Sequence, residues 1–233
     1  MSNRFEVKYL IEYSRGIDFI NKLRFFMKID PKSLQPPYLV SSLYFDTVDF
    51  KNYEAVLNGE KKREKVRLRK YSPDAENGFF EIKHKNNRSI SKDRVFGNIS
   101  DFYEFIKCPT ARTLPPKMDD FYYFLAVHNY FSTVTVNYQR IALLDLIGEK
   151  NRVTLDFNIR CGNEDLFFGK PSPHDLRVLP PDLAVIELKF HEKIPKWLKD
   201  VVSKFKLNPT NYSKYTNSIE RIYKKKEIIT ELY

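Results

Sequence analysis

A positive charge occupies every second residue of the segment Arg63-Glu-Lys-Val-Arg-Leu-Arg-Lys-Tyr71. Because side chains alternate between the two faces of a β-strand, the cations at 63, 65, 67 and 69 project to one face. Neighbouring cations on such a face lie about 7 Å apart and repel, and a merely solvated face would usually relieve this with Glu, Ser or Thr. The segment therefore predicts a strand with one face suited to a multivalent anion.

Other segments repeat this division into an apolar and a charged face. Their charged positions are Glu6 and Lys8, then Glu81, Lys83 and Lys85, then Lys92 and Arg94, then Asp156 and Arg160, and finally Glu187 and Lys189. An antiparallel sheet with one solvated face shows the same alternation, so that simpler account stays open. If the sheet instead closes with its charged face inward, the lumen becomes a polar tunnel that is strained unless it holds an anion.

The pattern of the whole chain indicates eight or so strands with helices between them. We expect strands near 4–12, 39–46, 63–71, 78–85, 91–96, 132–146, 152–161 and 184–191. We expect helices near 15–28, 49–57, 99–107, 117–130, 195–206 and 211–226, and an extended loop over 162–182. With no internal repeat and no linker, residues 1–233 predict one α+β domain around a mostly antiparallel sheet.

The composition points to an anionic partner. The chain has 40 Lys and Arg against 30 Asp and Glu, a formal net charge of +10, which suits nucleic acid, an acidic membrane surface or phosphate compounds. No nucleic-acid-binding signature and no glycine-rich phosphate loop occurs, so we expect no nucleic acid and phosphates held by side chains. No apolar run approaches a bilayer span and the start lacks a signal peptide, which predicts a cytoplasmic protein without a membrane segment.

Four carboxylates share the charged faces with the cations. They are Glu6, Glu81, Asp156 and Glu187. Each could simply pair with a neighbouring Arg or Lys. A phosphate site, however, often uses one or two carboxylates to hold Mg²⁺ or Mn²⁺ against phosphate oxygens, and both accounts remain open. Cys108 and Cys161 lack the spacing of a zinc site and are too few for a disulfide scaffold.

Eight short motifs make the chain similar to a known family, the VTC domain. This is the polyphosphate polymerase domain of the vacuolar transporter chaperone complex, a member of the triphosphate tunnel metalloenzyme superfamily. The motifs follow the family's order over about residues 3–223: Arg4-Phe-Glu-Val-Lys-Tyr9, Ser42-Leu-Tyr-Phe-Asp-Thr47, Arg67-Leu-Arg69, Phe80-Glu-Ile-Lys83, Lys92-Asp-Arg94, Asn137-Tyr-Gln-Arg140, Val185-Ile-Glu-Leu-Lys189 and Ser213-Lys-Tyr215.

The resemblance implies a closed eight-stranded antiparallel β-barrel, the triphosphate tunnel, with surrounding helices. It also implies transfer of the ATP γ-phosphate to a growing polyphosphate chain, with Mn²⁺ or Mg²⁺. The residues it assigns to catalysis are Lys8, Arg67, Arg69, Lys83, Arg140 and Lys189, and those it assigns to phosphate binding are Lys92, Arg94 and Lys214. Glu187 would be the principal metal ligand, and Glu6, Glu81 and Asp156 would be weaker candidates.

One departure from the superfamily bears on the expected reaction. The superfamily opens with Glu-x-Glu-x-Lys, whereas Arg4 stands here in place of the first Glu. Arg4 then joins the phosphate-binding candidates, and the loss of a carboxylate favours a one-metal polymerase. A tripolyphosphate or nucleoside triphosphate hydrolase of the same fold and a non-catalytic polyphosphate-binding module remain alternatives. Relatives of this type have membrane-spanning partners, so a membrane partner also stays open.

Overall fold

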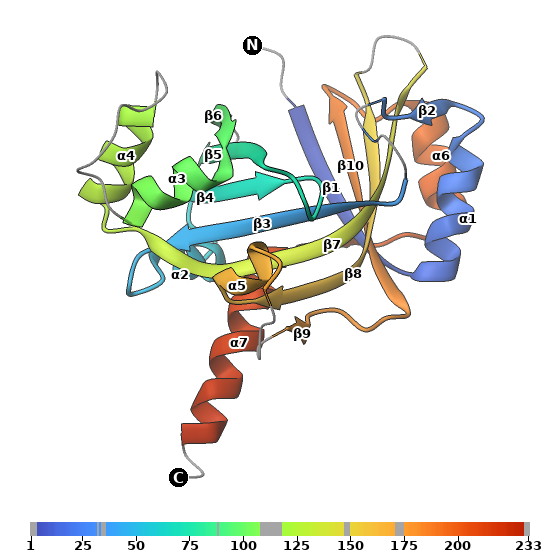
Figure 1. The fold of residues 1–233 in the computed structure, drawn as a ribbon. Helices are drawn as coiled ribbons and strands as arrows, with labels where there is room; N and C mark the ends of the chain where they lie inside the picture. The colour runs from blue at the N-terminus through green and yellow to red at the C-terminus, as the bar shows by residue number, and fades with distance from the viewer. Residues whose placement is uncertain are drawn as a thin grey trace. The chain divides into compact units, whose positions relative to one another are not determined.

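The computed structural model describes residues 4–31, 33, 36–87, 89–107, 118–146, 150–170 and 175–230 (Figure 1). Cys108 and residues 171–174 of the predicted loop lie outside this part of the chain. The strands are β1 (Arg4–Glu12), β2 (Met27–Ile29), β3 (Tyr38–Asp46), β4 (Lys62–Lys70), β5 (Asn77–Asn86), β6 (Ser89–Asn98), β7 (Phe131–Asp145), β8 (Arg152–Gly162), β9 (Leu176–Arg177), β10 (Leu183–His191) and β11 (Pro209–Thr210). The helices are α1 (Tyr13–Leu23), α2 (Lys51–Leu57), α3 (Ile99–Lys107), α4 (Met118–Val127), α5 (Glu164–Phe167), α6 (Lys196–Lys204) and α7 (Lys214–Thr230).

The strands form one 11-stranded sheet in the order β11-β1-β10-β8-β7-β3-β4-β5-β6, with β2 on β7 and β9 on β8. Antiparallel ladders join the strand pairs β1–β10, β1–β11, β10–β8, β3–β4, β4–β5 and β5–β6. The predicted α+β class with a mostly antiparallel sheet is therefore confirmed.

The predicted closed eight-stranded barrel is wrong. Among the described residues the strand order has two ends, β11 and β6. The eight predicted strands all exist, and the additional β2, β9 and β11 have three residues or fewer. Such short strands leave no periodic signal in the sequence. Side-chain alternation fixes the two faces of each strand, but it carries no information on whether the end strands pair.

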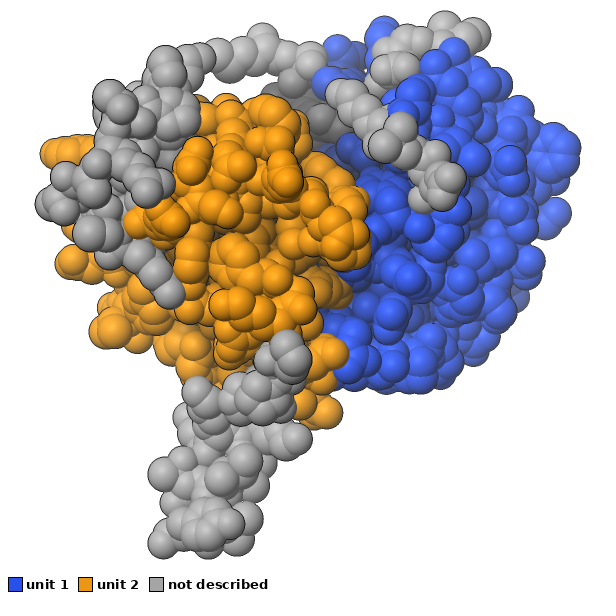
Figure 2. All heavy atoms as spheres, in the orientation of Figure 1, with its two compact units in different colours: residues 1–39, 138–160, 177–214 blue, residues 40–137, 161–176, 215–233 orange. Residues whose placement is uncertain are grey.

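The chain divides into two compact units (Figure 2). Unit 1 comprises residues 1–39, 138–160 and 177–214, and unit 2 comprises residues 40–137, 161–176 and 215–233. No helix in the described part of the chain is both long enough and apolar enough to cross a membrane.

The core of unit 1 lies between the apolar face of β1, β10 and β8 and the helices α1 and α6, which pack side by side in Figure 1. Tyr9, Ile186 and Leu155 form one cross-strand row of this face. Helix α1 packs closely on the strands at Gly16, where a Cβ would lie 2.8 Å from a Leu155 methyl carbon. The alternate side chains of these strands are left to face away from the core.

The helix predicted for residues 15–28 is wrong at its end. Helix α1 stops at Leu23, and residues 27–29 form β2, which pairs with residues 143–145 of β7. Met27 is buried in the core of unit 1. Pairing with a distant strand overrides the local helical pattern here.

The core of unit 2 includes the apolar face of β4, opposite to the face that carries its odd-numbered cations. Leu43, Leu68, Phe80 and Val95 form a cross-strand row through β3, β4, β5 and β6. Buried apolar side chains of α3, α4 and α5 complete this core. The odd-numbered cations of β4 consequently occupy the opposite face of the sheet.

Candidate functional site

Unit 2 carries a strongly cationic sheet face, here called the cationic face. Its central row runs from Tyr44 on β3 through Arg67 on β4 and Glu81 on β5 to Arg94 on β6. The register and alternation of β4, β5 and β6 place eight cations on this face: Arg63, Lys65, Arg67, Arg69, Lys83, Lys85, Lys92 and Arg94. Among the described residues of these three strands, Glu81 is the one carboxylate on the face. The sequence prediction that these cations share a face is thus confirmed by the strand register.

Glu81 organises the cations around it. The side chain is 1% exposed, and its Oε2 accepts from Arg67 Nε at 2.7 Å, while Arg94 Nε lies 3.1 Å from Oε1. Lys92 Nζ also bonds Oε1, and Arg69 Nη1 lies 3.9 Å from Oε2. Burial alone would raise the pKa of Glu81, but Arg67, Arg69 and Lys92 together lower it far below its usual range. The carboxylate is therefore ionised whenever the protein is folded near neutral pH.

On β4, β5 and β6 the described part of the cationic face carries eight cations and one carboxylate, so its formal charge is strongly positive. Lys92 and Arg94 keep 40% and 39% of their side chains exposed, so the face is reachable from solvent at β6. Arg guanidinium groups offer forked donors that match phosphate oxygens, and Lys adds compact charge. The arrangement can therefore bind a multivalent anion.

Tyr44 lies on this face and was not predicted as a site residue from the sequence. The side chain is buried, and its hydroxyl accepts from Arg67 Nη1 at 3.3 Å. Burial opposes ionisation, but Arg67, Arg69 and Lys65 outweigh it and lower the pKa of Tyr44 to about 7. Tyr44 has the same alternation on β3 as Ser42, and Ser42 Oγ accepts from Arg69 Nε. That shared alternation within the Ser42–Thr47 motif was the available signal.

We expect one tyrosine of the folded protein to titrate near pH 7, because the pKa of Tyr44 is lowered to about 7. The measurement is tyrosinate ultraviolet absorbance against pH. Tripolyphosphate should move this titration to higher pH, since a bound polyanion neutralises the cations that lower the pKa. Tyr44→Phe should remove it, and an unchanged titration in that variant would contradict the assignment.

Because the folded-state pKa of Tyr44 lies below that of the unfolded chain, ionised Tyr44 stabilises the fold fully above about pH 10, and this contribution is lost as pH falls through about 7.

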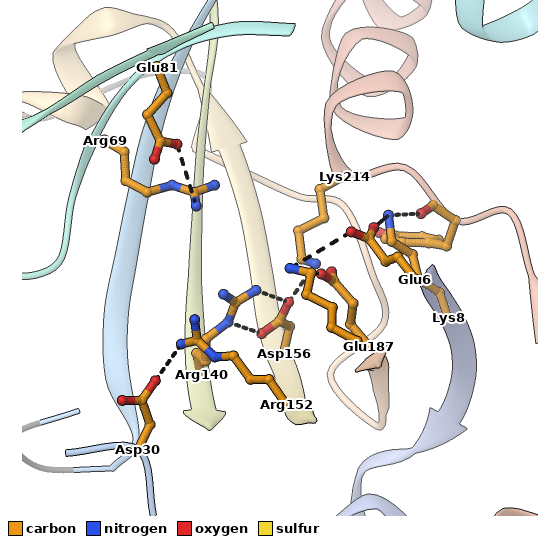
Figure 3. A network of polar contacts seen from close by, with 12 residues as sticks. Glu6, Lys8, Asp30, Arg69, Glu81, Arg140, Arg152, Asp156, Glu187 and Lys214 are labelled. Carbon is orange, nitrogen blue, oxygen red and sulfur yellow. Dashed lines mark hydrogen bonds and ion pairs between the residues drawn. The ribbon is translucent and has the colours of Figure 1, made fainter. Parts of the chain in front are cut away.

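Unit 1 carries a second charged face, in which cations and carboxylates are more nearly balanced. Lys8 on β1 pairs in register with Glu187 on β10, and the neighbouring row pairs Glu6 with Lys189. Arg140 from β7 and Lys214 from the start of α7 point toward Asp156 of β8 (Figure 3). The strand alternation brings the first four residues together as the sequence predicted.

Asp156 holds two of the predicted site cations, Arg140 and Lys214, in fixed positions. Its fully buried carboxylate accepts from Arg140 Nε at 2.6 Å and from Arg140 Nη2 at 2.7 Å. Lys214 Nζ lies 2.6 Å from Asp156 Oδ2. Burial would raise the pKa of Asp156, but Arg140 and then Lys214 lower it, and in return the carboxylate raises the pKa of Lys214. This triad is an ion-paired network with fixed geometry.

Glu187 and Glu6 share lysines in the same unit. Lys189 Nζ bonds Glu187 Oε1 and lies 3.8 Å from Glu6 Oε2, and Lys8 Nζ lies 3.4 Å from Glu6 Oε1. Lys8 also donates to the Tyr212 carbonyl oxygen at 3.2 Å. Burial opposes ionisation of Glu187, but Lys189 and Lys8 hold its pKa well below the usual range. Glu187 is therefore a buried, ionised carboxylate surrounded by lysines.

These contacts do not fit a metal site made of protein ligands alone. The four candidate ligands are divided between the units, with Glu81 in unit 2 and Glu6, Asp156 and Glu187 in unit 1. Across the residues that the structure describes, no three His, Cys, Asp or Glu side chains are grouped to hold a metal ion. Each candidate carboxylate has a cationic partner instead. The four carboxylates are thus ion-paired in the described part of the chain, and a metal ion bound by one or two of them would need further ligands from substrate phosphates.

Arg4 begins β1, and its side chain lies outside the described part of the structure. The sequence missed the ion pair between Arg152 Nη2 and Asp30 Oδ2, at 2.8 Å in unit 1. Asp30 follows the short β2 and has no alternation that could have placed it.

Two solved structures have a fold similar to that of this chain. A solved structure from Bacillus halodurans, described as a suspected adenylate cyclase, has a TM-score of 0.54 at 13% sequence identity, covering 95% of this chain and 99% of that one. One from Vibrio parahaemolyticus, described in the same way, has a TM-score of 0.50 at 12% identity, covering 92% of this chain and 96% of that one. At such identities the likeness concerns the fold alone. Comparison with curated proteins finds no match.

The family comparison covers nearly the whole chain. The model of the VTC domain matches residues 3–223. That span includes every strand of the cationic face and the ion-paired network of unit 1. The protein belongs to the VTC domain family.

Proposed function

We propose that the protein is a metal-dependent polyphosphate polymerase that transfers the γ-phosphate of ATP to a polyphosphate chain. The observation that carries this proposal is the cationic face, with eight cations and one carboxylate on β4, β5 and β6. Membership of the VTC domain family supports the same substrate class. A surface with many cations close together attracts a long polyanion, and this face has eight of them on three adjacent strands.

The residues would act by position and charge. Phosphoryl transfer involves little covalent chemistry for the protein, so catalysis rests on alignment and on neutralising the phosphate oxygens. We assign phosphate binding to residues of both charged faces: Arg4, Lys8, Arg67, Arg69, Lys83, Lys92, Arg94, Arg140, Lys189 and Lys214. Asp156 and Glu81 keep several of these cations oriented before a substrate arrives.

Mn²⁺ or Mg²⁺ enters this proposal with the nucleotide. Mg²⁺ is commonly held by one or two carboxylates together with substrate phosphates. A divalent cation on the phosphate oxygens would reduce their negative charge. Glu187 remains our first candidate for a protein contribution, because it is buried and ionised in unit 1.

The test is incubation of the full chain with ATP and Mn²⁺. We expect ADP and a ladder of long phosphate chains on a gel. Arg67→Ala should slow chain growth about 10- to 100-fold, because a charge-assisted hydrogen bond contributes roughly 1.5–3 kcal/mol. Arg221→Ala removes an exposed cation of α7 and serves as the control. Absence of both ADP and chains across metals and pH would refute the polymerase.

The same assay separates the alternatives. A hydrolase of tripolyphosphate or nucleoside triphosphates would release orthophosphate without chain growth. A binding module would retain polyphosphate without turnover, and Glu187→Ala would leave that binding largely intact. Because two structural neighbours are described as suspected adenylate cyclases, cyclic AMP should be measured as well.

A further inference from the structure

An aromatic cluster lies directly beside the central row of the cationic face. Phe79 of β5 and Phe96 of β6 are opposite one another in the ladder, with ring centroids 4.9 Å apart. The ring of Tyr71 lies 6.1 Å from that of Phe79. Arg69 pairs with Phe79 in register, so Arg69, Phe79 and Phe96 form one cross-strand row. Tyr71, Phe79 and Phe96 are here called the aromatic cluster.

Two of the three rings of the aromatic cluster are exposed to solvent, and Phe79 is partly buried. Phe96 is 61% exposed and Tyr71 is 38% exposed, and β6 ends the strand order of the sheet. The opposite face of β6 contributes Val95 to the buried core, so burial in that core does not explain the position of Phe96. Large exposed apolar groups at a polar site often mark a binding surface.

Two contacts join the aromatic cluster to the cations. The Arg94 guanidinium carbon lies 3.3 Å from the centroid of the Phe79 ring, while Arg94 Nε lies 3.1 Å from Glu81 Oε1. Arg69 hydrogen-bonds the hydroxyl of Tyr71 and helps to lower the pKa of that group against the effect of burial. The aromatic and phosphate-binding groups are therefore parts of one contiguous surface.

We propose that the aromatic cluster is a nucleobase-stacking subsite that holds the base of a nucleoside triphosphate while its phosphates contact the cationic face. The inference rests on the proposed phosphate binding by that face. Successive rows of a strand face lie about 7 Å apart, a span that a ribose can bridge. Aromatic side chains stack on any base, because every base has a π-face. The subsite would distinguish nucleotides from inorganic polyphosphate.

The experiment compares two ligands that share three phosphates. Dissociation constants for ATP and for inorganic tripolyphosphate are measured by calorimetry with the full-length wild type and Phe96→Ala. We expect Phe96→Ala to weaken ATP binding about 5- to 100-fold and to leave tripolyphosphate binding unchanged. Phe96→Tyr keeps a ring and should retain the ATP affinity. Tyr123→Ala removes another exposed aromatic of unit 2, 70% exposed on α4, and should change neither constant.

Each outcome bears on one of the two proposals. Equal losses for both ligands in Phe96→Ala, or no loss for either, would overturn the subsite while phosphate binding stands. Failure of the wild type to bind tripolyphosphate would overturn the phosphate-binding function, and the subsite with it. Since Phe96 is 61% exposed, the variant should unfold at the wild-type temperature. If that temperature falls, Phe96→Tyr decides, and an ATP affinity as low as that of Phe96→Ala would refute stacking.

Discussion

Asp156→Asn should lower the free energy of unfolding by about 3–5 kcal/mol, because removing one member of a buried ion pair leaves uncompensated charge. Asp156 is fully buried and accepts two hydrogen bonds from Arg140, at 2.6 and 2.7 Å. Lys214, which is partly buried, adds a second cation at 2.6 Å. Asn keeps the size of the side chain and removes its charge, so the change measures electrostatics and not a cavity. Urea unfolding followed by circular dichroism gives the difference.

The matched control is Asp200→Asn, which makes the same chemical change at an exposed position of α6. That variant should stay within about 0.5 kcal/mol of the wild type. If Asp156→Asn proved no less stable than this control, the buried network could not be the stabilising contact that its geometry indicates.

The pH dependence of stability gives an independent check on Asp156. Its folded-state pKa is lowered, so its contribution is present above the pKa of the unfolded chain and is lost as pH falls through the folded value. The wild type should therefore lose this part of its stability in acid. Asp156→Asn lacks the titrating group, so the stability difference between the two proteins should narrow as pH falls.

The strand faces could be predicted from the sequence because alternation is a local property. Arg67 and Arg69 fall on the charged face and Leu68 in the core for the same geometric reason. The order of the strands could not be predicted in this way, since pairing depends on residues far apart in the chain. Strand β2 is an example, because residues 27–29 pair with residues 143–145 instead of extending helix α1.

The roles of the carboxylates needed the structure for a related reason. A carboxylate on a cationic face suits an ion pair and a metal site equally well at the level of sequence. Asp156 takes one partner from β7 and one from α7, and neither is its sequence neighbour. Tyr44 was missed because its lowered pKa depends on Arg67 and Arg69 of the adjacent strand. Residue type and spacing alone do not predict such contacts between side chains that are far apart in the sequence.

The second large effect is expected for Glu81→Gln. Glu81 is 1% exposed and is the carboxylate around which Arg67, Lys92 and Arg94 converge. Gln keeps the shape but leaves these cations to repel one another, so the free energy of unfolding should fall by about 3–5 kcal/mol. Glu60→Gln, at an exposed position before β4, is the matched control and should have little effect.

The response of Glu81→Gln to an anion tests what the cationic face is for. A ligand that binds only the folded state raises stability in proportion to its affinity. Because the variant lacks the one carboxylate that the described residues of β4, β5 and β6 place on this face, tripolyphosphate should bind it more tightly than the wild type and raise its unfolding temperature further. The comparison is made by thermal unfolding with and without the ligand. An equal rise of the unfolding temperature in both proteins would mean that tripolyphosphate binds away from Glu81. That result would contradict the assignment of the cationic face as the phosphate-binding site.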